Sequence, residues 1–223
     1  MLQTIFPSQT PPTMDLNNLL PAIDCIREKP CTTDLRAAAY LATYPSIRMH
    51  ARQFSAIDQS AFHQVAAMVY GWMPRILRLD LRYVADATTA LNVSASASLE
   101  THADVSVADI SACVRSVVGT SKMLHFVNDT IFPIWDSRIE TLRSGSKPTN
   151  EHMGCVENFA SYVKEVHAIR IEPGFADFCD RFRAAYTDRL QAMGIATYEI
   201  SEVRVVEAAA FELASQMLPP TPR

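Results

Sequence analysis

The sequence lacks three features that would narrow its class at once: a long apolar run, a secretion signal and a grouped set of cysteines. No apolar stretch approaches the roughly 20 residues that a membrane-spanning helix needs, so we expect no membrane partner. The first residues contain neither the basic segment nor the apolar core of a signal peptide. A cytoplasmic protein is therefore expected.

The cysteines form no CxxC pair and no Cys/His group with the spacing of metal ligands. Because their number is odd and their spacing is wide, we expect buried free thiols, no bound metal and no iron–sulfur cluster. No other cofactor is indicated. The cysteines are Cys25, Cys31, Cys113, Cys155 and Cys179.

Glycine is scarce, with 6 residues in 223, and period-two alternation of apolar side chains is nearly absent. Apolar positions instead recur at three- and four-residue spacing, which predicts an all-α protein of roughly eight to ten helices. We expect one catalytic domain over residues 15–216, with two lobes as an alternative, and flexible ends at 1–14 and 217–223. The expected helices cover 15–28, 33–43, 58–83 with a break before Pro74, 84–100, 110–118, 150–170, 175–192 and 201–216, with two short ones opening at Lys122 and Asp136.

The formal net charge of −4 argues against a strongly basic nucleic-acid binder. The basic residues are unevenly distributed, however. Residues 111–148 carry five basic and three acidic side chains, and residues 71–82 carry three arginines and one aspartate. A local basic face on an acidic protein is therefore compatible with DNA contact.

Two consecutive stretches carry the most information, from Val117 to Phe126 and from Ile131 to Arg138. They predict a helix, a tight turn at Gly119, a second helix that opens near Lys122, and an apolar loop that delivers Asp136 to the start of a further helix. This order resembles the helix-hairpin-helix DNA glycosylases, in particular their 8-oxoguanine-glycosylase-like branch. The resemblance implies a helix-hairpin-helix fold around a central cleft, with the hairpin at 110–128.

The resemblance also implies an activity: a base is flipped out of double-stranded DNA and its N-glycosidic bond is hydrolysed, which leaves an abasic site. Both base-excision repair and defence against phage DNA with modified cytosine fit this activity. The hairpin keeps only Gly119 where the family commonly has two glycines. This departure argues against ordinary 8-oxoguanine specificity, and a bulky modified base, such as glucosylated hydroxymethylcytosine, is an alternative substrate. We expect the protein to act as a monomer.

The hairpin is expected to bind DNA through exposed backbone amides at the start of its second helix, which point toward a phosphate. Gly119 allows close approach of the backbone. Thr120 and Ser121 add short donors, and Arg138 lies in the helix that follows Asp136.

Asp136 is the expected catalytic carboxylate, because positive charge builds on the sugar as the glycosidic bond breaks. The alternative is that Asp136 is only a helix N-cap. Lys122 has three interpretations. Its amine attacks C1′ and forms a Schiff base, it binds a phosphate, or it is solvated without a role. Monofunctional and bifunctional enzymes therefore both remain open.

The base pocket needs an apolar wall and a few polar groups. Local candidates are Trp135, His125 and Phe126, and more distant ones are Tyr70 and Trp72. Each has a structural alternative. His125 is equally explained as an interior histidine, and the segment around Trp72 as a buried bend rather than a pocket wall or a wedge between bases.

Two rival functions remain. The first is a non-catalytic helix-hairpin-helix module that binds DNA. The second is an unrelated α-helical enzyme or interaction protein in which Lys122 and Asp136 form a structural pair. Base release separates the glycosylase from the module, and DNA affinity separates both from the unrelated protein.

Overall fold

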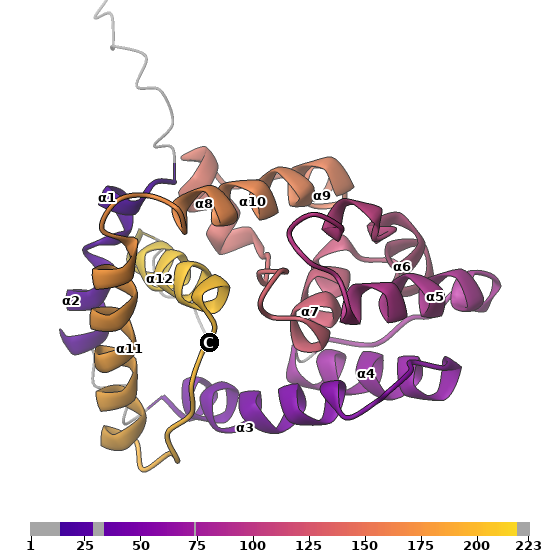
Figure 1. Cartoon of the computed structure of the whole chain (residues 1–223), viewed down its shortest axis with the longest axis horizontal. Coiled ribbons are helices and arrows are strands. Elements are labelled where there is room, and N and C mark those ends of the chain that lie inside the picture. The colour runs from indigo at the N-terminus through magenta and orange to yellow at the C-terminus, as the bar shows by residue number, and fades with distance from the viewer. Residues whose placement is uncertain (1–13, 29–33, 74, 218–223) are drawn as a thin grey trace, which may run out of the picture.

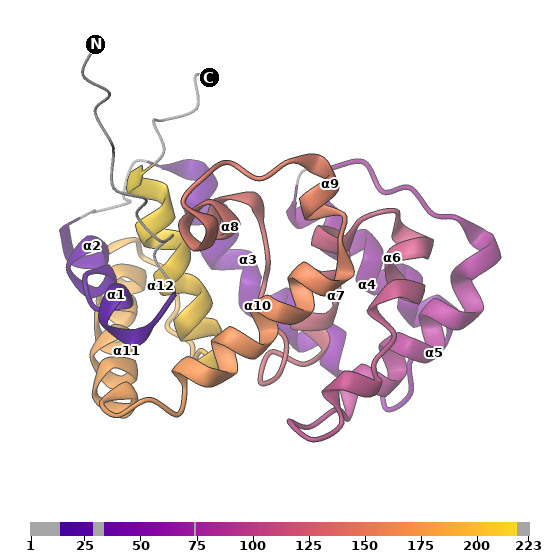
Figure 2. The ribbon, with the colours of Figure 1, turned by 90° about the horizontal axis from the view of Figure 1, so that it is seen from above.

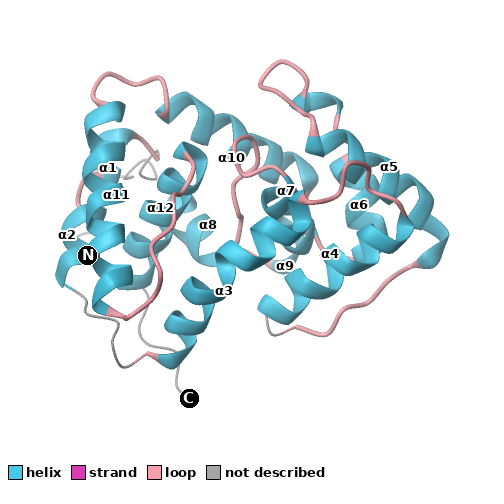
Figure 3. Cartoon of the chain, turned by 60° about the horizontal axis from the view of Figure 1, so that its bottom comes forward, coloured by secondary structure: helices cyan, strands magenta, loops and turns pink. Residues whose placement is uncertain are grey.

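The computed structural model describes residues 14–28, 34–73 and 75–217, and all regular structure in these ranges is helical (Figure 1, Figure 3). The expectation of an all-α protein is confirmed. The helices are labelled α1 to α12, more than expected, partly because α1 and α9 are single turns of 4 residues. Most of the two expected flexible ends, together with Cys31 and Pro74, lies outside the described residues.

The helices of the first half are α1 (Leu16–Leu19), α2 (Ala22–Glu28), α3 (Leu35–Arg52), α4 (Gln59–Trp72), the 3-10 turn η2 (Leu81–Tyr83), α5 (Val84–Ala95) and the 3-10 turn η3 (His102–Asp104). Those of the second half are α6 (Val107–Val114), α7 (Val117–Val127), α8 (Ser137–Ser144), α9 (Asn150–Met153), α10 (Val156–Ile169), α11 (Phe175–Ala192) and α12 (Glu202–Met217).

The helices pack in two groups that share one apolar core (Figure 1, Figure 2). In the first group α1 and α2, from the start of the chain, pack against α11 and α12 from its end, and α8 packs on α12. The second group contains α4 to α7 and the part of α3 that contacts α4 and α7. Because α10 touches both α7 and α12, it joins the two groups beside the segment that carries Asp136.

Helix α3 continues through Pro45 to Arg52, although the sequence predicts that it ends near residue 43. A proline inside a helix removes one N–H donor and leaves the carbonyl four residues earlier without its partner. In this protein that carbonyl belongs to Leu41, and the Tyr198 hydroxyl donates to it at 2.9 Å. A residue 157 positions away therefore replaces the lost hydrogen bond.

Several helix boundaries follow the sequence signals. Helix α6 begins with a side-chain cap, since the Ser106 hydroxyl accepts from the amide of Asp109. Helix α11 has the predicted limits, and its apolar side chains are buried. The range 15–28 is instead divided between α1 and α2 by a turn at Leu20 and Pro21.

The predicted position of the hairpin turn is wrong. The chain turns at Arg115 and Ser116, before Gly119: Arg115 adopts a left-handed conformation with φ of 56° and Ser116 caps α7. Gly119, Thr120 and Ser121 lie inside α7 and are buried. Helix α7 therefore opens at Val117, and Lys122 lies in its middle.

Gly119 is required for a close approach between helices rather than for a turn. A Cβ atom at this position would lie 2.5 Å from the Tyr70 hydroxyl oxygen, which belongs to α4. The same hydroxyl donates to the Val114 carbonyl at 2.9 Å and so satisfies the end of α6. Tyr70 can reach this carbonyl because residue 119 has no side chain.

We expect Gly119→Ala to lower the free energy of unfolding by roughly 1–3 kcal/mol, because the added methyl group overpacks against Tyr70. The effect opposes the intrinsic helix propensity, which favours alanine. Urea unfolding measures the change.

Gly71→Ala is the matched control, since Gly71 lies in α4 and a Cβ there meets no atom within 4 Å. It should raise stability by roughly 0.5–1 kcal/mol. Combining Gly119→Ala with Tyr70→Phe should cost less than the sum of the two single changes. Equal effects of the two alanine substitutions would contradict the close-approach role.

Candidate functional site

A buried loop, residues 128–135, connects α7 to α8 and is fixed to α7 by Ser121. The Ser121 hydroxyl accepts a hydrogen bond from the Trp135 amide at 3.1 Å. Its own hydrogen has two possible acceptors, the Val118 carbonyl at 2.9 Å and the Trp135 carbonyl at 3.3 Å. Trp135 is fully buried, and its indole N–H donates to Glu140 at 2.9 Å. Asp136 directly follows Trp135, and Ser121 directly precedes Lys122. The contact between Ser121 and Trp135 therefore sets the position of Asp136 relative to Lys122.

Asp136 caps helix α8. Its Oδ1 accepts from the amides of Arg138 and Ile139, at 2.9 and 3.1 Å. Its side chain is half-buried, and within the described residues Oδ2 makes no hydrogen bond. The capping role is therefore real, and it leaves one carboxylate oxygen for other contacts.

Lys122 is half-buried and has no direct ion pair among the described residues. Burial lowers the pKa of its amine, while the nearby carboxylates of Asp136 and Glu207 oppose the shift. The structure therefore brings Lys122 and Asp136 within electrostatic range of each other. A depressed pKa increases the share of neutral, nucleophilic amine near pH 7.

Glu207 of α12 completes the site from a distant part of the chain. It is buried and forms an ion pair with Arg204, one turn earlier in the same helix. Burial raises the pKa of Glu207 to about 7, although the Arg204 guanidinium opposes the shift. The Tyr162 hydroxyl and the Arg204 Nε are buried in the same region and have no hydrogen-bond partner among the described groups.

The burial of Glu207 is predictable from the spacing of apolar residues in the last helix. Val203, Val206 and Ala210 mark the buried stripe of the last helix, and Glu207 has the i+4 position of the same stripe. A charged residue within an apolar stripe is buried on folding, and buried carboxylates need a partner or a proton. Arg204, three residues earlier, supplies the partner.

The residues expected to contact DNA through the hairpin are used internally. The Gly119 amide donates to the Ser116 hydroxyl at 2.9 Å, and the Thr120 hydroxyl donates to the Ser116 carbonyl at 2.9 Å. The expectation of exposed amides at 119–121 is therefore wrong, because the helix begins earlier. The Arg138 guanidinium lies 5.3 Å from the centre of the Phe211 ring and is partly buried.

The candidates for the base pocket are not brought together as an open wall. Trp135 and Phe126 are fully buried, and Trp72 packs edge-on against Phe126 with ring centres 5.2 Å apart. Tyr70 is buried under α7. These aromatic side chains form part of the core in this structure.

His125 is an interior histidine. Its Nδ1 donates to the Phe132 carbonyl at 2.8 Å, so Nε2 is free to accept from the Tyr44 hydroxyl at 2.8 Å. Tyr44 also lies 3.4 Å from Asp129, which forms ion pairs with Arg48 and Arg52 of α3. Burial lowers the pKa of His125 to about 3.

Two surface cavities lie away from Asp136 and Lys122. One, of about 540 Å³, lies between α3, α5 and the end of α7, and the other, of about 590 Å³, lies between α11 and residues 197–200. In the described part of the chain no three His, Cys, Asp or Glu side chains gather as a metal site. Cys113 and Cys179 are buried free thiols, as predicted, Cys25 is also buried, and Cys155 is partly exposed. No described helix is long and apolar enough to cross a bilayer.

Comparison with known proteins assigns no family. No family model, curated protein or solved structure matches this chain. Its function is therefore inferred from the side chains and their surroundings.

The pKa of His125 predicts acid sensitivity. Because this pKa falls from 6.5 to about 3 on folding, the folded state binds fewer protons than the unfolded state between these pH values. The stability that the neutral ring contributes is present above pH 6.5 and is lost as the pH falls toward about 3. We expect His125→Gln to be less stable by roughly 1–3 kcal/mol at about pH 7.5, because it cannot make both hydrogen bonds.

The same variant should lose less stability on acidification. The slope of unfolding free energy against pH should decrease by up to one proton, about 1.4 kcal/mol per pH unit. Urea unfolding at a series of pH values measures the slope. His50→Gln, at a surface histidine of α3, is the control. If the free energy of unfolding depended on pH equally in the wild type and in His125→Gln, His125 would not be the source of the acid sensitivity.

Proposed function

We propose that this protein is a DNA glycosylase in which Asp136 acts on the sugar of a flipped nucleotide. The observation that carries the proposal is the position of Asp136 near Lys122, which the hydrogen bond from the Trp135 amide to the Ser121 hydroxyl sets. Neither residue is fully buried, so each keeps some contact with solvent at the surface. This proximity is the arrangement that the resemblance to helix-hairpin-helix glycosylases implies.

The chemistry needs a carboxylate near C1′ of the sugar. As the N-glycosidic bond breaks, its electrons leave with the base and positive charge develops on the sugar. The Asp136 carboxylate stabilises this charge, and water or an amine then adds to C1′. The buried surroundings of Trp135 and Tyr162 strengthen the interaction, since charges interact more strongly where water is excluded.

The start of α7 supports DNA binding at a new position. The first amides of a helix lack intrahelical acceptors and attract phosphate. With the turn at Arg115 and Ser116, these amides belong to Val117, which is buried, and to Val118, which is half-buried, rather than to residues 119–121. Arg115 is exposed beside them.

Asp136→Asn tests the catalytic role without removing the helix cap, because asparagine caps helices as well as aspartate does. We expect base release to fall by roughly 10²-fold or more, with DNA affinity and thermal stability unchanged. The assay uses end-labelled duplexes that carry 8-oxoguanine, uracil, alkylated purines, hydroxymethylcytosine or glucosylated hydroxymethylcytosine, and hot alkali reveals abasic sites.

Asp58→Asn is the control, since Asp58 also caps a helix, α4, where it accepts from the Ala61 amide at 2.8 Å, and it lies in a different part of the fold. If both variants release base like the wild type, Asp136 is only a cap. If the wild type binds the duplexes but releases no base, the non-catalytic DNA-binding module becomes the better assignment.

Lys122 is expected to form a Schiff base with C1′, because its pKa is lowered by burial. Borohydride should then trap a covalent complex of the wild type with DNA, and Lys122→Gln should form none. Lys164→Gln, at an exposed lysine of α10, should be trapped like the wild type. Abasic sites without any trapped complex would instead indicate a monofunctional enzyme that uses water.

A further inference from the structure

The connection between α4 and α5 has a composition that the site does not explain. Residues 75–82 read Arg-Ile-Leu-Arg-Leu-Asp-Leu-Arg, and we call them the arginine arm. They contain no α-helix and run along the outside of the molecule, on the upper edge in Figure 2.

Alternate residues hold the arm against the rest of the molecule. Leu77 and Leu79 pack against the core, and the Asp80 amide donates to the Cys113 carbonyl at 2.8 Å. Ile76 and Arg78 lie at the intervening positions and are exposed, with Ile76 83% accessible. A segment held in this way presents its outward side chains in a defined orientation.

The outward side of the arm is positively charged. Asp80 is its only acid, and it is paired with Arg82 at 2.7 Å and lies 3.8 Å from Arg115. Neither Arg75 nor Arg78 forms an ion pair with any described residue, and both are exposed. These two guanidiniums therefore remain available to an anionic partner.

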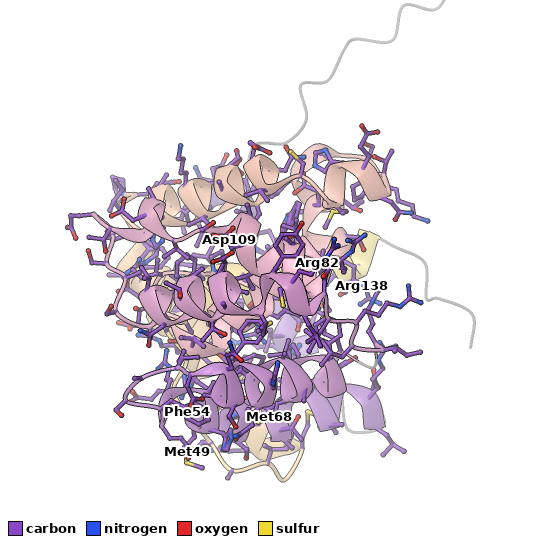
Figure 4. All side chains as sticks on the ribbon, turned by 90° about the vertical axis from the view of Figure 1, so that its right-hand side faces the viewer. Met49, Phe54, Met68, Arg82, Asp109 and Arg138 are labelled. Carbon is purple, nitrogen blue, oxygen red and sulfur yellow. The ribbon has the colours of Figure 1, made fainter. Side chains whose placement is uncertain are left out.

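The arm lies beside the candidate site. The Arg75 amide donates to the Tyr70 carbonyl at 3.2 Å, and the Tyr70 side chain packs on Gly119, one turn before Lys122 in α7. Arg115 belongs to the turn before α7. Arg82 and Arg115 both approach Asp80, at 2.7 and 3.8 Å. Arg82 and Arg138 project toward the same edge in Figure 4, although α8 and α5 lie in different halves of the molecule in Figure 1. The basic side chains of the arm and of the turn before α7 therefore lie close together.

We propose that the arginine arm lies along duplex DNA, with Arg75 and Arg78 on phosphates and Ile76 inserted between base pairs next to the reacting nucleotide. The proposal rests on the proposed function for its partner. Proteins that deform DNA combine basic side chains on the backbone with an apolar wedge between base steps. A membrane surface fits less well, because interfacial segments present their apolar side chains from an amphipathic helix.

The first test measures the affinity for an undamaged duplex over a range of salt concentrations. The double variant Arg75→Gln/Arg78→Gln should bind roughly 10-fold more weakly near 0.1 M salt, and its log–log salt slope should decrease by about 0.9 per arginine. Arg27→Gln is the control: Arg27 is exposed in α2, at the opposite end of the molecule (Figure 1).

The second test addresses Ile76. A duplex with 2-aminopurine next to the target base should gain fluorescence when the wild type unstacks it. Ile76→Ser should lose most of this gain, with affinity changed less than about threefold. Ile171→Ser changes an isoleucine with 87% exposure on the α10–α11 connection and should behave like the wild type.

The outcomes distinguish the arm from the glycosylase. An unchanged affinity and salt slope in the double arginine variant would overturn the arm even if Asp136 releases a base. If the double arginine variant lost binding to anionic phospholipid vesicles but kept its affinity for DNA, the proposal that the arm binds DNA would be overturned in favour of a membrane surface. A full fluorescence gain with Ile76→Ser would overturn the insertion. Arm-dependent DNA binding without base release would support the arm and contradict the proposed function.

Discussion

The hydrogen bond from the Trp135 amide to the Ser121 hydroxyl is the interaction on which the candidate site depends. It joins the middle of α7 to the end of the loop that follows it, across 14 residues. Lys122 directly follows Ser121 and Asp136 directly follows Trp135. This contact therefore sets the relative positions of the two charged side chains. Because Trp135 is fully buried and its indole donates to Glu140, the loop end cannot shift without exposing a large apolar ring and breaking this bond.

Burial then sets the chemistry of the groups that this contact assembles. Burial lowers the pKa of Lys122 and raises that of Glu207 to about 7, so both groups titrate closer to neutrality than they do in water. The two shifts have the same origin, since burial disfavours the charged form of either group. Arg204 limits the shift of Glu207 and remains charged itself. The site therefore combines a carboxylate, an amine of reduced basicity and a buried acid that is paired with Arg204, which are elements of acid–base and nucleophilic chemistry.

The sequence predicts features that short-range chemistry decides. Ser106, Asp136 and the apolar stripe of α11 follow from capping and periodicity within a few residues. The features that it does not predict depend on partners far along the chain. Pro45 is tolerated inside α3 because of Tyr198, and Gly119 lies inside a helix because Tyr70 of α4 approaches it. A glycine that permits a turn and a glycine that permits close contact look the same in a sequence, and only the packed structure separates them.

The net charge of the chain is a poor guide to its partner for a similar reason. At about 0.1 M salt, exposed charges interact over roughly 10 Å, so a bound duplex is affected by the nearest side chains rather than by the total of −4. Acidic groups that are already paired, such as Asp80 with Arg82 and Glu212 with Arg189, add little repulsion at a distance. Exposed arginines without an acidic partner, Arg75 and Arg78, determine the local field. An acidic protein can therefore present a basic face to DNA where the fold pairs its carboxylates and leaves a few guanidiniums unpaired.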